Sequence, residues 1–189
     1  GLALAAAGDA RAAGDRYAEL DGLLQRAPVA SPINQVKAKV GLAASALESG
    51  QARKAIDSLT QAERVLNESA RLDPEPDVVW RRSLVDNYHY SPVQYRALVA
   101  GLRAGADRAL GDYPSALAAT RSRVELLEKR LRETTADEDR LELAQAYHHL
   151  AELHDHLGDA SAATRAVERG LELSDEYDEN TGSEVNDAG

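Results

Sequence analysis

The sequence predicts an all-α protein of about eight or nine helices that pair as antiparallel hairpins. Apolar residues recur at three- and four-residue steps along most of the 189-residue chain, whereas few segments alternate with the period of two typical of strands. Alanine and leucine are abundant, Phe is absent and aromatic residues make up 4% of the chain. Small side chains let helices approach closely, as stacked hairpins require.

The clearest hairpin spans Leu143 to Asp175. In its first half the residues that share one helix face, and that we therefore expect to be buried, are Leu143, Ala146, Tyr147, Leu150, Ala151, Leu153, His154 and Leu157. In its second half the corresponding residues are Ala163, Ala166, Val167, Gly170, Leu171 and Leu173. Gly158 can take the left-handed conformation that ends the first helix, and Asp159 can cap the second. These residues predict a tight turn.

The earlier elements follow the same plan. Gly8-Asp9 precedes a helix that ends near Ala27, so residues 1–27 are predicted to be a hairpin whose apolar start, Leu2–Ala7, is the end of a helix and too short to span a membrane. Pro28 and Pro32 mark a loop, with Ser31 as a predicted N-cap. A second hairpin occupies residues 33–72, and Gly50 closes its first helix.

The third unit, residues 77–134, contains one helix more than the others. An inserted helix is predicted from Asp77 to Tyr90 and carries Trp80, the single Trp of the chain. Ser91-Pro92 starts the next helix, and Gly111-Asp112 repeats the turn. The last hairpin covers residues 137–178, and residues 179–189 are predicted to be an acidic flexible tail.

The last hairpin resembles a tetratricopeptide (TPR) repeat, a helix–turn–helix unit of about 34 residues. The matching positions are Tyr147, Leu150, Ala151, His154, Gly158, Ala163, Val167 and Gly170, and in the second hairpin Leu42, Ala43, Ala46, Gly50, Ala55, Leu59 and Ala62. His154 stands where the family has a tyrosine, and Asp175 where it has a proline. The turn glycines lie 42, 61 and 47 residues apart, so longer helices or an extra helix fill each step. The resemblance implies a TPR-like α-solenoid over residues 1–178.

A second resemblance concerns the context of the chain. Leu72-Asp73-Pro74, Trp80 to Leu84 and Leu110 to Leu117 are similar to TPR segments attached to bacterial serine/threonine kinases and signalling regulators. This resemblance implies a regulatory or docking module and not a free enzyme, although the full-length protein could carry a kinase or another catalytic domain. The absence of Met, even at position 1, also predicts a piece of a longer protein or a processed chain.

The charge distribution narrows the choice of partner. The formal net charge is −10, and seven carboxylates without any Lys or Arg lie from Glu172 onward. Nucleic acid is disfavoured as a partner, because phosphate binding needs a basic face. The absence of Cys removes disulfides, thiol catalysis and zinc–thiolate sites. We expect no membrane insertion of this segment and a cytoplasmic protein, with a periplasmic part of a membrane-anchored receptor as the alternative.

The TPR resemblance assigns the concave face to the first helix of each hairpin. The residues that it places there are Lys37, Val40 and Ala44 in the second hairpin and Gln145, His148, Glu152 and Asp155 in the last. Val40 and Ala44 replace the Lys and Asn with which chaperone-binding TPR domains clamp a terminal carboxylate. The resemblance therefore favours an apolar peptide or helix whose basic group meets Glu152 and Asp155. The expected function is a non-catalytic protein- or peptide-binding scaffold that needs no cofactor.

Two alternatives stay open. Self-association would use Leu2–Ala7 or the last helix around Leu171 and Leu173. Metal binding would use His148, Glu152 and His156, which share a helix face at i, i+4 and i+8, although the order of a metalloprotease motif is absent. We favour instead a polar stripe facing a groove, with His154 packed inside the hairpin. No Gly-rich phosphate loop or nucleophile elbow is present.

Overall fold

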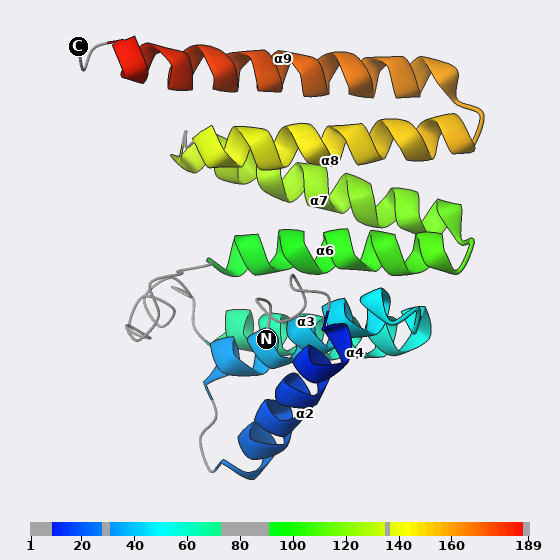
Figure 1. Cartoon of the computed structure of the whole chain (residues 1–189), viewed down its shortest axis with the longest axis vertical. Helices are drawn as coiled ribbons and strands as arrows, with labels where there is room; N and C mark the ends of the chain where they lie inside the picture. The colour runs from blue at the N-terminus through cyan, green and yellow to red at the C-terminus, as the bar shows by residue number, and fades with distance from the viewer. Residues whose placement is uncertain (1–8, 28–30, 73–90, 135–136, 187–189) are drawn as a thin grey trace. The chain divides into compact units, whose positions relative to one another are not determined.

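The computed structural model describes residues 9–27, 31–72, 91–134 and 137–186, which form seven α-helices (Figure 1). These ranges contain no strand, which confirms the all-α prediction. The predicted helix from Asp77 to Tyr90 and the segment Leu2–Ala7 lie outside the described residues. The total of eight or nine helices therefore stays a prediction. The chain divides into two compact units, Gly1–Asp112 and Tyr113–Gly189.

The first unit contains α2 (Ala10–Arg26), α3 (Pro32–Glu48), α4 (Ala52–Leu72) and α6 (Pro92–Ala109). Helix α3 packs against α2 and α4, and α6 packs mainly against α4 and more lightly against α3. Their apolar faces meet in one core, whose buried members are Ile33, Val36, Val40, Ala43, Ala52, Ala55, Leu59, Ala62, Leu66, Tyr95, Val99 and Ala106. Six of these twelve residues are Ala or Val on α3 and α4, so the helices lie close together.

Close approach is most evident where α2 crosses α3. A Cβ atom on Gly41 would lie 2.3 Å from the ring of Tyr17, so only glycine leaves room for this ring. Beside it, Lys39 Nζ lies 2.7 Å from Asp21 Oδ2, and both side chains are largely shielded from solvent. The ring contact and this ion pair fix α2 on α3.

The helix ends agree with the sequence signals. Gly50, Gly111 and Gly158 have φ of +70°, +77° and +79°, which confirms the predicted left-handed residues at the turns. Asp159 Oδ1 accepts a hydrogen bond from the backbone N–H of Ala162 at 3.0 Å, and so caps the last helix. Ser91 begins α6 with a full capping box, whereas Ser31 precedes Pro32 without a side-chain cap.

The second unit contains α7 (Tyr113–Thr134), α8 (Asp137–His156) and α9 (Ala160–Asn186). Helix α8 packs against both neighbours and runs alongside α9 (Figure 1). A buried ion pair joins α7 to α8: Arg130 Nη2 lies 2.5 Å from Asp139 Oδ1. Helix α9 continues to Asn186, so helical backbone extends through most of the segment predicted as a tail. No proline interrupts that segment.

The two units repeat one arrangement. Gly158 lies as many residues after Gly50 as Ala160, the first residue of α9, lies after Ala52, the first residue of α4. We call this separation along the sequence the unit offset. The order α2, α3, α4 in the first unit thus corresponds to α7, α8, α9 in the second. The first unit has a further helix, α6, packed on α4. Among the described residues of the second unit no helix follows α9.

Buried Asp107 near the end of α6 makes stability depend on pH. Burial raises the pKa of its carboxyl above the ordinary 3.8, Arg103 opposes this shift, and Asp112 adds to it. The folded state thus holds this proton at higher pH than the unfolded chain does. The contribution of Asp107 to stability falls as pH rises through the window above 3.8, and no such loss exists below it.

We therefore expect Asp107→Asn to stabilise the protein at neutral pH. Loss of a buried carboxylate near a helix C-terminus should add about 0.5 kcal/mol to the free energy of unfolding. The gain should shrink as the pH approaches 4. Urea titrations of the wild type and the variant at several pH values measure this difference. A gain that is the same at every pH would contradict the assignment to Asp107 ionisation.

Candidate functional site

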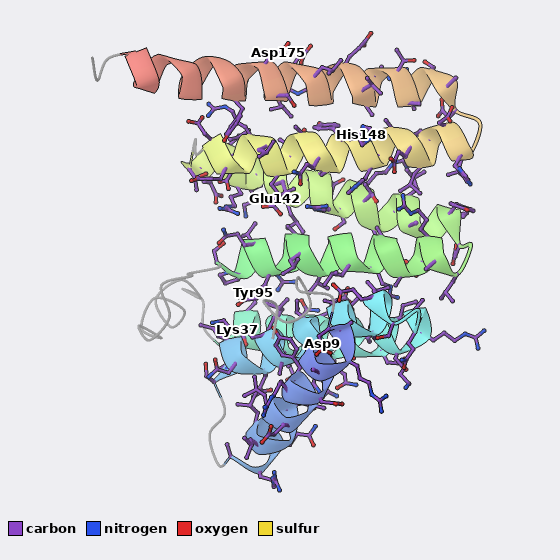
Figure 2. All side chains as sticks on the ribbon, viewed as in Figure 1. Asp9, Lys37, Tyr95, Glu142, His148 and Asp175 are labelled. Carbon is purple, nitrogen blue, oxygen red and sulfur yellow. The ribbon has the colours of Figure 1, made fainter. Side chains whose placement is uncertain are left out.

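The polar residues that the sequence places on α8 do lie on its exposed side. Gln145, His148, Glu152 and Asp155 are all exposed, and they follow one another at three- and four-residue steps. His148 Nε2 lies 3.4 Å from Glu152 Oε1, and Figure 2 marks His148 on α8. These side chains form a polar edge along one side of the helix.

A groove between α8 and α9 runs beside this edge. It consists of two open hollows, of about 290 and 410 Å³, that share His148 and Val167. We call it the α8–α9 groove. Its lining residues are Leu141, Ala144, Gln145, His148, His149, Ala151, Glu152, Asp155, Ala160, Ala163, Thr164, Val167, Glu168, Gly170, Leu171 and Ser174. The floor is formed by small residues, and a Cβ atom on Gly170 would lie 3.3 Å from the backbone oxygen of Ala144.

The groove corrects one prediction. The sequence pattern predicts burial of Val167, Leu171 and Leu157, yet their exposed fractions are 42%, 59% and 43%. The prediction is wrong for these three residues, because an apolar face is buried only if another element covers it. Among their neighbours in the pattern, Leu173 is fully buried. Self-association through the last helix would therefore rest on Leu171 and not on Leu173.

Carboxylates surround this apolar surface. Asp155 lies on the α8 edge and Glu168 on the α9 edge, and both line the groove. Asp175 lies two helical turns beyond Glu168 on α9 and is exposed; Figure 2 labels it. Over the part of the chain that the structure describes, none of the three carboxylates forms an ion pair. Sequence reasoning passed over Glu168, because a single exposed Glu on a helix gives no signal of its own.

The residues predicted from the second hairpin lie in the first unit. Val40 is only 5% exposed and belongs to the core, whereas Lys37 and Ala44 are half-buried. Val40 therefore offers almost no surface to a ligand. Since this set and the set on α8 belong to different units, a single concave face that combines them stays a prediction.

The histidines of α8 have separate environments. His154 is buried, as expected, with Nε2 at 3.4 Å from Arg121 Nη2 and Nδ1 at 3.6 Å from Asp159 Oδ2. His156 packs instead against the ring of Tyr113, with centroids 4.2 Å apart. Among the described residues no group of three potential ligands is placed to hold a metal ion. The geometry does not bring His148, Glu152 and His156 together as a metal site.

Comparison with known proteins gives no family for the chain: no protein-family model matches it, and no curated protein matches it. None of the helices in the described ranges combines the length and apolar character that a bilayer span requires.

Proposed function

We propose that this chain is a non-catalytic protein-binding module that uses the α8–α9 groove and its polar edge. The observation that carries the proposal is the exposed apolar pair Val167 and Leu171, next to the carboxylates Asp155 and Glu168. Large apolar side chains gathered in a groove with a charged rim are typical of surfaces that bind another protein. The proposal assigns no covalent step and no cofactor to this chain.

The same proposal covers the repeat architecture of the chain and its role within a larger protein. The turn glycines and the paired helices support a TPR-like helical repeat whose hairpins hold the binding residues in fixed positions. A rigid surface loses little conformational entropy on binding, which favours affinity. We propose a docking or regulatory role in a larger bacterial signalling protein of the cytoplasm. Catalysis, where the full-length protein has it, would reside in another domain.

The experiment is a capture from a lysate of the source cells, followed by a binding measurement with each purified candidate. We expect Glu152→Lys with Asp155→Lys to weaken binding about tenfold or more, because two attractive contacts become repulsive. A matched control is Glu125→Lys with Glu133→Lys, which reverses two exposed carboxylates of α7. Equal binding by the two double variants would contradict a role for the α8 edge.

The purified protein also allows a test of self-association. Leu171 is exposed enough to join two copies, so sedimentation velocity should be recorded over a hundredfold range of protein concentration. A monomer at all concentrations supports a foreign partner. A dimer that disappears in Leu171→Lys would instead assign the apolar surface to a second copy of the chain.

A further inference from the structure

In the first unit, the surface equivalent to the α8–α9 groove is filled by α6. Helix α6 packs on α4 and α3 and contributes Tyr95, Val99 and Ala106 to the core. Under it, Leu59 of α4 is 0% exposed. The groove between α3 and α4 is thus a seat for one amphipathic helix, and α6 shows how such a helix lies in it.

The second unit repeats the seat and leaves it open. When the unit offset is added to the number of each core residue of α3 and α4, the result is a residue that lines the α8–α9 groove. In order, these positions are Leu141, Ala144, His148, Ala151, Ala160, Ala163, Val167, Gly170 and Ser174. Buried Leu59 corresponds to Val167, which is 42% exposed. In the described part of the chain, α6 covers Leu59 and no helix covers Val167.

The outer edge of the seat indicates which charge would favour a helix bound there. On α6, Arg103 Nη1 donates to Thr60 Oγ1 at 3.3 Å, and Arg96 Nη1 donates to Asn67 Oδ1 at 2.8 Å. The same unit offset places Glu168 at the position of Thr60 and Asp175 at that of Asn67. Two neutral acceptors are replaced by two carboxylates, which pair more strongly with Arg or Lys.

The inner edge differs in the same direction. Val40, Ala44 and Leu47 of α3 correspond to His148, Glu152 and Asp155 of α8. A Cβ atom on Gly105 of α6 would lie 3.9 Å from Leu47 Cδ1, so a residue at that place in a bound helix would approach Asp155. Gly105 of α6 lies beside the apolar side chain of Leu47, whereas a helix in the α8–α9 groove would gain from a basic residue at that place, beside Asp155.

We propose that the α8–α9 groove binds an amphipathic helix of a partner protein, seated as α6 is seated on α3 and α4. Its apolar stripe covers Val167 and Leu171, and two basic residues seven positions apart meet Glu168 and Asp175. This inference rests on the proposed protein-binding function and specifies its ligand as a basic helix. It differs from an extended peptide, because the seat is shaped for a whole helix.

The probe is a fluorescent peptide of residues 91–110 of this chain with Gly105→Lys, which retains Arg96 and Arg103. Its reversed form carries Arg96→Glu and Arg103→Glu. Fluorescence anisotropy measures both peptides against the wild type and against Glu168→Arg with Asp175→Arg. Glu168 and Asp175 are exposed in the protein, and Arg96 and Arg103 are exposed in the free peptide. Circular dichroism should therefore show that the protein variant folds as the wild type does.

The wild type should bind the basic peptide about tenfold or more tightly than the reversed one, and the charge-reversed protein should invert that preference. Glu125→Arg with Glu133→Arg is the control protein and should behave as the wild type. Equal affinity for both peptides, a control that also inverts, or no binding of either peptide would overturn the basic-helix ligand.

The experiments distinguish a failure of the basic-helix ligand from a failure of the protein-binding function. A cellular partner that the wild type binds and Glu152→Lys with Asp155→Lys loses, together with no peptide binding, would keep the protein-binding module and remove the helical ligand. Dimerisation abolished by Leu171→Lys would give the seat to a second copy and overturn the foreign helix. A partner whose binding is unaffected by every groove variant would remove both proposals.

Discussion

Replacing Asp139 with alanine should lower the free energy of unfolding by about 3–5 kcal/mol, because it leaves the guanidinium of Arg130 shielded from solvent without its partner. Asp139 is 1% exposed; its Oδ1 lies 2.5 Å from Arg130 Nη2, and its Oδ2 accepts a hydrogen bond from Thr134. Arg130 Nη1 also lies 3.8 Å from Glu142 Oε2, which still compensates part of its charge, so we expect a loss toward the lower end of this range. Urea denaturation followed by circular dichroism measures the change.

Two comparisons separate the ion pair from general damage. The double variant Arg130→Met, Asp139→Leu should recover most of the loss, since a buried pair can be replaced by apolar side chains at little cost. Glu172→Ala breaks the exposed pair with Arg169, where Nη1 and Oε2 lie 2.8 Å apart, and should cost under about 1 kcal/mol. A loss in Asp139→Ala no larger than that in Glu172→Ala would contradict the buried pair.

Leu59→Ala should destabilise the protein by about 2–5 kcal/mol, whereas Val167→Ala should change stability by no more than about 0.5 kcal/mol. Leu59 is fully buried beneath α6, whereas Val167, at the equivalent position of α9, is 42% exposed and no helix of the described ranges lies over it. The removal of buried methyl groups leaves a cavity, but the same removal from a solvent-facing groove does not.

The matched pair tests whether the second seat is open. The free energies of unfolding from urea titrations should separate the two variants by several times the experimental error. If Val167→Ala were as damaging as Leu59→Ala, the groove would be packed in solution and would not be a binding surface. If neither variant lost stability, the packing of α6 on α4 would be in doubt.

Local features of the fold could be predicted from the sequence because each depends on a few neighbouring residues. Gly50, Gly111 and Gly158 mark the turns, since glycine enters left-handed conformations with little strain. Ser91 followed by Pro92 marks the start of α6, because serine caps a helix and proline fits its first turn. Burial of His154 also followed from its place on the apolar face of α8.

The candidate site was harder to predict, because exposure depends on elements distant in sequence. Periodicity identifies Val167 and Leu171 as members of an apolar face, yet it contains no information on whether another helix covers that face. The same limit applies to Val40, which the TPR resemblance places on a binding surface and the structure places in the core. The polar edge of α8 could be predicted, since exposed polar residues at helical spacing share a side.

Glu168 and Asp175 illustrate what only the structure supplies. Their meaning comes from the contacts of Arg103 and Arg96 with Thr60 and Asn67, which become visible once α6 is seen on α4. The turn spacings of 42, 61 and 47 residues also obscure the repeat, because the unit that recurs contains more than one hairpin. The unit offset, from Gly50 to Gly158, becomes evident from the helix bounds.

The most direct measurement of the seat uses a thiol placed inside it. The chain contains no Cys, so Val167→Cys introduces a single reactive site whose alkylation rate reports access to the groove. We expect fast alkylation in the free protein and at least about tenfold slower alkylation with saturating basic peptide, while Glu125→Cys on α7 keeps its rate. Slow alkylation of Val167→Cys without peptide, or equal rates with and without it, would contradict an open groove that binds a helix.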